Sequence, residues 1–146
     1  MNDIEIDLRK ATEKDVVRVS ELCSQLGYQA NPDMVLSRLK KIDSEREHRV
    51  WVAEIEGLVV GWIQCASRIT IESGEFAEIV GLVVDEKSRT RGIGRKLVEK
   101  AERWAKEIGQ QSIRVRTNVK RVESNIFYRT LGFSETKKQS VLQKSI

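Results

Sequence analysis

The feature that most constrains the fold of this chain is an apolar run followed by a glycine- and arginine-rich loop and an amphipathic helix. Between Glu75 and Val84, nearly every position after Glu78 is apolar, which is typical of a central strand covered on both faces. The loop Arg89 to Arg95 has the sequence RTRGIGR. Apolar residues then recur at helical spacing at Leu97, Val98, Ala101, Trp104, Ala105 and Ile108. This order predicts an α/β fold with a layered core.

Periodicity elsewhere predicts the remaining elements. We expect a first strand over 4–8 and two helices over 12–26 and 31–42. A hairpin of strands over 50–55 and 58–66 is expected around Glu56-Gly57, followed by a strand over 112–117, a helix over 122–131 and one or two final strands over 133–144. The 146 residues suit a single domain, 1–146.

Composition excludes several classes of protein. His48 is the only histidine, which argues against a histidine-based catalytic triad or zinc site, so no metal is expected. Cys23 and Cys65 lie in apolar patterns and are expected to be buried free thiols. The start, MNDIEIDLRK, lacks a signal-peptide pattern and no run approaches the ~18 apolar residues of a membrane span. We therefore expect a cytoplasmic protein with no membrane partner.

The RTRGIGR loop has the chemistry of an anion site. The first turn of a helix leaves about four backbone N–H groups unpaired at the positive end of the helix dipole. Gly92 and Gly94 let a phosphate approach these groups, and Arg89, Arg91 and Arg95 add positive charge around it. A diphosphate is the expected ligand. The alternative is that the glycines only shape a turn and the arginines are solvated.

Two other glycine motifs do not fit this loop. The dinucleotide-binding fingerprint needs a third glycine where Leu97 stands, and the Gly-Lys-Ser/Thr of a Walker A loop is absent.

The chain resembles the GNAT superfamily of acyl-CoA-dependent N-acetyltransferases along essentially its whole length. The family signature Arg/Gln-x-x-Gly-x-Gly/Ala is matched by Arg89, Gly92 and Gly94, and its Tyr-x-x-x-Gly-Phe hallmark is matched within 126–133 (IFYRTLGF). The resemblance implies a mixed, mostly antiparallel sheet of six to seven strands flanked by about four helices. Its fourth and fifth strands would run parallel and splay apart to admit acetyl-CoA.

The resemblance also implies which residues bind the cofactor. The central-strand backbone would pair with pantetheine as an added strand, and the loop amides would hold the pyrophosphate. The implied set is Leu82, Val83, Val84, Arg89, Arg91, Gly92, Ile93, Gly94, Arg95 and Asn118. In the family an asparagine often precedes the tyrosine by seven residues. Arg121 stands there and Asn118 is the nearest asparagine before it, so either could take that role.

Transfer of an acyl group to an amine needs a proton acceptor for the amine and a donor for the departing thiolate. By the resemblance, Tyr128 would lie beside the sulfur and act as the donor; otherwise it is a core aromatic. Glu78 resembles the base that some members carry on this strand, where apolar walls would raise its affinity for a proton. It could instead be an edge charge, with water relaying the proton.

These features predict an N-acetyltransferase that uses acetyl-CoA as cosubstrate and acetylates a primary amine of a small molecule or protein. The alternative is a catalytically silent CoA-binding regulatory module of the same fold. A nucleic-acid-binding domain is disfavoured because the three tryptophans lie in apolar patterns and not among basic residues. Homodimerisation through the C-terminal strands is a further expectation from the resemblance.

Overall fold

A long antiparallel hairpin forms the middle of the sheet in the computed structural model, which describes residues 5–146. Strand β2 covers His48–Ile55 and β3 covers Leu58–Thr70. Both residues of the connecting turn have positive φ, 50° at Glu56 and 80° at Gly57, as a two-residue hairpin turn requires. The predicted hairpin is confirmed. His48 is the first residue of β2.

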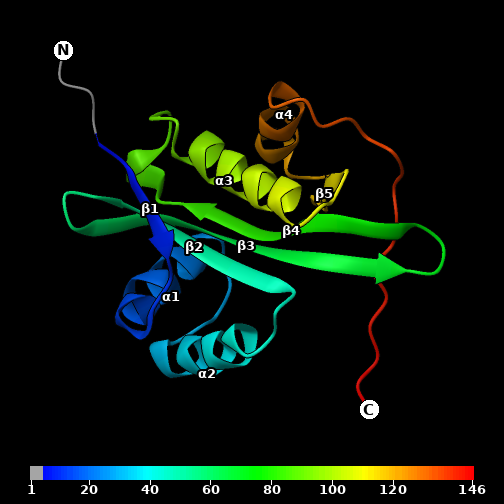
Figure 1. Cartoon of the computed structure of the whole chain (residues 1–146). Helices are drawn as coiled ribbons and strands as arrows, with labels where there is room; N and C mark the ends of the chain where they lie inside the picture. The colour runs from blue at the N-terminus through cyan, green and yellow to red at the C-terminus, as the bar shows by residue number, and fades with distance from the viewer. Residues whose placement is uncertain (1–4) are drawn as a thin grey trace. The chain divides into compact units, whose positions relative to one another are not determined.

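The sheet has five strands in the order β1-β2-β3-β4-β5 (Figure 1). Strand β1 covers Asp7–Lys10, β4 covers Gly74–Val84 and β5 covers Ile113–Val115. The first three pairings are antiparallel and β4 pairs with β5 in parallel. The expected mixed, mostly antiparallel sheet with parallel fourth and fifth strands is therefore confirmed. Ile4, where the first strand was expected to begin, lies outside the described residues.

Helices cover both faces of this sheet (Figure 1). A short 3₁₀ turn, Glu13–Asp15, leads into α1, Val16–Gln25, and α2, Pro32–Asp43, follows on the same face. The side chain of Asn31 accepts a hydrogen bond from the Met34 amide and so caps α2. Helix α3, Ile93–Glu107, lies on the other face with Leu97, Val98 and Ala101 fully buried.

The layers pack closely. Leu22 of α1 and Leu39 of α2 share one core cluster with Val50 and Val52 of β2. On the opposite face, a Cβ at Gly61 would lie 3.0 Å from the Val83 carbonyl oxygen and within 3.3 Å of side chains of α3. A glycine at this point therefore lets α3 settle on the sheet.

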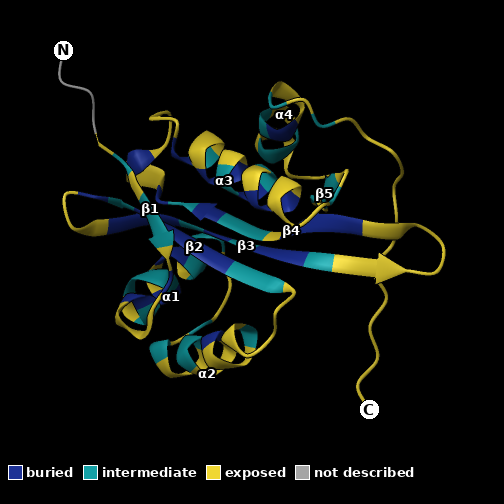
Figure 2. Ribbon diagram, in the orientation of Figure 1, coloured by how far each residue is buried: buried dark blue, intermediate teal, exposed yellow. Residues whose placement is uncertain are grey.

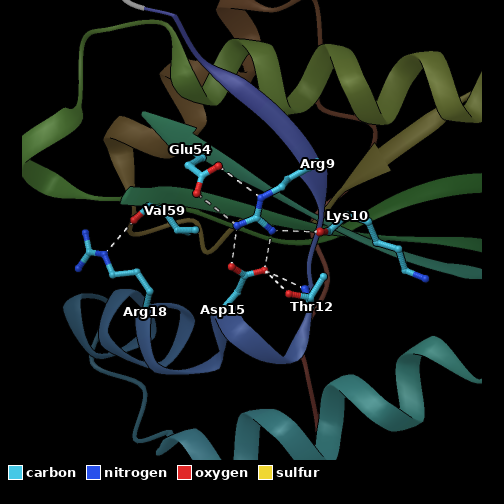
Figure 3. Close-up of polar contacts among 7 residues, drawn as sticks. All are labelled: Arg9, Lys10, Thr12, Asp15, Arg18, Glu54 and Val59. Carbon is cyan, nitrogen blue, oxygen red and sulfur yellow. Dashed lines mark hydrogen bonds and ion pairs between the residues drawn. The ribbon is translucent and has the colours of Figure 1, made fainter. Parts of the chain in front are cut away.

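Arg9 joins β1 to its neighbours (Figure 3). Its guanidinium group donates two 2.8 Å hydrogen bonds to the buried Asp15 carboxylate and lies 3.4 Å from Glu54 of β2. Burial alone would raise the pKa of Asp15, but hydrogen bonds from Arg9 and from the Thr12 amide bring it below its usual value. Arg9, Asp15 and Glu54 thus form an ion-pair network that joins three elements.

The chain divides into two compact units, one reaching Arg116 and the other running Thr117–Ile146. The second unit contains α4, Val122–Thr130, which was expected over 122–131. The single-domain assignment over 1–146 stays a prediction.

The final strands expected over 133–144 are absent from the described residues, so the sheet has five strands and not six to seven. This tail carries few apolar side chains and is coloured as exposed in Figure 2. Val141 and Leu142 are about nine-tenths exposed. Without apolar burial or a paired neighbour, the backbone lacks the contacts that stabilise a strand.

Candidate functional site

An open edge of β4 is the first component of the candidate site. Strand β5 pairs only with Ala77, Glu78 and Ile79 among the described residues, so Leu82, Val83 and Val84 extend beyond its end. Their other edge is hydrogen-bonded to β3. Val83 is buried in the core, whereas Leu82 and Val84 are half-buried. This segment can accept an extended ligand as an additional strand.

Asp85 anchors the chain where β4 ends. Its carboxylate is buried, forms an ion pair with Arg18 of α1 and accepts hydrogen bonds from the Gln25 side chain and the Lys87 amide. Burial alone would raise the pKa of Asp85, but these hydrogen bonds and the Arg18 charge bring the pKa below its usual value. Gln25 also accepts from the Glu86 amide. The first turn after β4, Glu86–Ser88, is therefore held against α1.

The loop then enters α3 through two residues in the left-handed region, Thr90 at φ 70° and Gly92 at φ 78°. Gly92 has no side chain that could cap the helix, and the first helical hydrogen bond across this junction runs from the Lys96 amide to the Gly92 carbonyl oxygen. The amides from Ile93 to Arg95 precede that bond and stand at the positive end of a 15-residue helix.

Positive side chains surround these amides. Arg89, Arg91 and Arg95 are all exposed, while Ile93 is buried and Gly94 is half-buried in the first turn. The predicted loop residues are thus brought together, with the arginines outside and the apolar anchor inside. Such an arrangement can bind a diphosphate.

A β-bulge in β4 decides which way Glu78 points. Gln64 pairs with Gly81 and Cys65 pairs with Ile79, so Val80 is an extra residue in β4. Ala66, two residues after Gln64, pairs with Glu78. Glu78 therefore lies on the same face as Gly81, although the two are an odd number of residues apart. That face is the one covered by α1 and α2, because a Cβ at Gly81 would meet the Trp62 ring, which packs on their core.

The surroundings of Glu78 differ from the apolar walls that the sequence suggested. Its carboxylate is buried, but Oε1 lies 3.4 Å from Nη2 of Arg68 and Oε2 lies 3.9 Å from Nε of Arg116. Both arginines come from neighbouring strands or their ends. The expectation of apolar walls around Glu78 was therefore wrong. It failed because the pattern of β4 alone does not show which charged residues lie on the adjacent strands.

The other two predicted residues belong to the second unit. Tyr128 is buried in α4, with its ring edge-to-face to Phe127 and Phe133 at centroid distances of 5.0 Å and 5.5 Å. The Asn118 side chain accepts from the Lys120 amide and so shapes a turn before α4. Their proposed roles beside a cofactor stay predictions.

Sequence reasoning missed several residues that build these parts. Arg18 and Gln25, which hold Asp85, are distant in sequence and carried no motif. Asn125 was also missed: its side chain donates to the carbonyl oxygens of Asn118 and Arg121 and so ties the turn to α4. An asparagine in the first turns of a helix, just after a polar turn, was the available signal.

None of the helices within residues 5–146 has the length and hydrophobicity needed to cross a bilayer. In the same part of the chain, His, Cys, Asp and Glu side chains do not gather in groups of three or more that could hold a metal ion.

Comparison with known proteins agrees with this architecture. The family model described as "Acetyltransferase (GNAT) family" matches residues 16–133. An uncharacterized N-acetyltransferase of Chlorobaculum tepidum is 33% identical over 137 residues, covering 94% of this chain and 81% of the relative. An aminoalkylphosphonate N-acetyltransferase of Salmonella typhimurium is 30% identical, covering 89% and 86%. An uncharacterized N-acetyltransferase of Methanocaldococcus jannaschii is 36% identical over 91 residues, but the match spans only 40% of that relative.

Solved structures show the same fold. An aminoglycoside N-acetyltransferase in complex with CoA superimposes with a TM-score of 0.88 at 20% identity, covering 99% of this chain and 98% of that one. With the family model matching most of its length and relatives at 30% identity or more, the chain belongs to the acetyltransferase (GNAT) family.

Proposed function

We propose that this protein transfers an acetyl group from acetyl-CoA to a primary amine. One observation carries the proposal: the open edge of β4 leads directly into a loop whose helix N-terminus, Gly92 conformation and three exposed arginines suit a diphosphate. CoA has a matching order of groups, an amide-containing arm followed by a pyrophosphate. A binder of an isolated phosphate would not need the open strand edge.

In this proposal, Leu82 to Val84 pair with the pantetheine arm. The pyrophosphate binds to the loop from Arg89 to Arg95, which includes Ile93 and Gly94 in the first helical turn. Asn118 is assigned to the same cofactor. The ion pair and hydrogen bonds of Asp85 support the assignment, because they hold the loop in place before the ligand arrives and so lower the ordering cost of binding.

The reaction forms a bond between the amine nitrogen and the acetyl carbon and breaks the bond from that carbon to sulfur. Overall, one proton leaves the amine and one reaches the thiolate. We assign Glu78 as the acceptor of the amine proton, directly or through water, and Tyr128 as the donor to sulfur. The burial of Glu78 on a sheet face next to the open edge supports its assignment.

A silent CoA-binding regulatory module of the same fold is the alternative. Such a module would use the loop to bind CoA but would not use the buried Glu78 carboxylate as a proton acceptor. Relatives are named for acceptors as different as aminoglycosides and aminoalkylphosphonates, so the acceptor of this protein has to be inferred from the site itself.

Two measurements test the proposed function. Calorimetric titration should detect acetyl-CoA binding, and Arg91→Glu should weaken it about tenfold or more because it reverses a charge beside the pyrophosphate. Arg103→Glu, an exposed position on α3, is the matched control. Absence of binding by the unaltered protein would refute the cofactor site.

A screen of amines, with release of the CoA thiol as readout, then tests turnover. Glu78→Gln should bind acetyl-CoA normally but lower kcat about a hundredfold or more, as expected for loss of a general base. Undiminished turnover by this variant at every pH would remove Glu78 from the base role. Acetyl-CoA binding without turnover of any amine would favour the regulatory module.

A further inference from the structure

Three arginines share the sheet face on which Glu78 lies. Arg68 follows Ala66, the partner of Glu78 in β3, by two residues, and Arg114 is the partner of Glu78 in β5. Arg116 follows Arg114 by two residues. Side chains two apart on a strand point to the same face. Two segments of the chain, β3 and the region of β5, therefore place three arginines on the sheet face of one carboxylate.

The contacts of these arginines leave positive charge in excess. Arg68 and Arg116 approach Glu78 at 3.4 Å and 3.9 Å, and these are the ion pairs that they form among the described residues. The guanidinium group of Arg114 stacks 4.0 Å above the Phe76 ring and forms no ion pair within residues 5–146. Three cations thus share the sheet face of one carboxylate.

Other acidic residues of the same strands do not offset this charge. Strands β3 and β5 contain no Asp or Glu, and Glu75 of β4 pairs with Ile69, which alternates to the opposite face from Arg68. The arginines are also accessible, because 46% of the Arg68 side chain and 73% of the Arg116 side chain are exposed. By contrast, only 9% of the Glu78 side chain is exposed.

This excess of charge discriminates between amine acceptors. A polycationic amine would have to bring several positive charges next to three guanidinium groups, which is unfavourable. An amine that also carries an oxyanion group can place its nitrogen at Glu78 and its oxyanion on the arginines. Guanidinium groups suit phosphate, phosphonate and carboxylate because their N–H donors match two oxygens at once.

From these contacts we infer that the acceptor is a small amine bearing a phosphate, phosphonate or carboxylate group, bound by Arg68, Arg114 and Arg116 beside Glu78. This inference rests on the proposed acetyltransferase function and names the substrate class of that site. The stacking of Arg114 on Phe76 keeps one guanidinium group oriented before the ligand binds.

Binding and turnover of four amines test the inference. 2-Aminoethylphosphonate, ethanolamine and kanamycin represent an anionic, a neutral-headed and a polycationic acceptor, and glycine separates carboxylate from phosphonate. With CoA present, the phosphonate should bind about tenfold or more tightly than ethanolamine in calorimetric titration. The same order is expected for kcat/KM with acetyl-CoA.

Variants link the preference to the arginines. Arg114→Gln should reduce the ratio of phosphonate to ethanolamine affinity several-fold, without changing acetyl-CoA affinity, whereas Arg103→Gln on α3 should change neither. Three results would overturn the inference: equal affinity for phosphonate and ethanolamine, tighter binding of kanamycin than of the phosphonate, or an unaltered affinity ratio in Arg114→Gln. If acetyl-CoA still bound, the proposed function would remain intact. Failure to bind acetyl-CoA would instead refute the function, and the acceptor assignment with it.

Discussion

At the scale of single residues, buried carboxylates shape this protein. Asp85 is paired with Arg18 and accepts hydrogen bonds from Gln25 and Lys87, so its charge is compensated at the start of the loop. Glu78 is buried with weaker contacts, at 3.4 Å and 3.9 Å from two accessible arginines. The first arrangement holds backbone in place. The second leaves a carboxylate and its cations able to exchange partners with a ligand.

The lowered pKa of Asp85 predicts acid sensitivity. A carboxyl group whose pKa is lower in the folded state stabilises the fold above its unfolded pKa, and this contribution is lost as the pH falls through the folded pKa. That window lies below the ordinary pKa of 3.8. Asp85→Asn should therefore lower the free energy of unfolding near neutral pH, and the difference from the unaltered protein should shrink at about pH 3.

Urea unfolding at the two pH values measures this difference, with Glu86→Gln as the control because Glu86 is exposed and adjacent. A deficit of the same size in Asp85→Asn at both pH values would contradict the prediction.

At the scale of elements, polar links between segments complement the apolar layers. Arg9 connects β1 to the start of α1 and to β2, while Arg18 connects α1 to β3 by donating a 2.8 Å hydrogen bond to the Val59 carbonyl oxygen (Figure 3). Strand β1 has only four residues and lies at the edge of the sheet. Its attachment therefore depends strongly on Arg9.

Replacing Arg9 by methionine keeps most of the side-chain volume but leaves the Asp15 carboxylate buried without its cation. We expect a loss of about 1–3 kcal/mol in the free energy of unfolding, the cost of an unsatisfied buried group. Denaturant unfolding measures it, and Arg103→Met, at an exposed position on α3, should change it little. Equal stability of the two variants would show that Arg9 does not hold β1.

At the scale of the whole molecule, the five-stranded sheet and the C-terminal tail differ in what stabilises them. The interior of the sheet is covered on both faces, whereas residues 134–146 are exposed throughout (Figure 2). The expected dimer through C-terminal strands stays a prediction, and the tail is the segment on which it depends.

Hydrogen exchange tests this description. Backbone amides of 134–146 should exchange at least about a thousandfold faster than that of Ile63 in β3, because exchange of a core strand requires extensive unfolding. Exchange resolved by residue, at a fixed pH, gives both rates in one experiment. Slow exchange in the tail at low protein concentration would indicate additional strands within the chain. Slow exchange only at high concentration would indicate strands formed between chains.

Local patterns predicted much of the fold. The hairpin at Glu56-Gly57, helix α2 and the helix after Gly92 all depend on residues close together in sequence, so short-range chemistry was enough to place them. The tail was predicted wrongly because a weakly alternating segment becomes a strand only if another strand or an apolar layer receives it.

The sequence by itself determined the family motifs, the apolar central strand and the glycine- and arginine-rich loop before α3, because each is encoded by consecutive residues. Only the tertiary structure decided the direction and surroundings of Glu78. The bulge at Val80 is a mismatch between two strands, and Arg68 and Arg116 reach Glu78 by strand pairing across the sheet. Such contacts depend on register, which one strand's pattern does not specify.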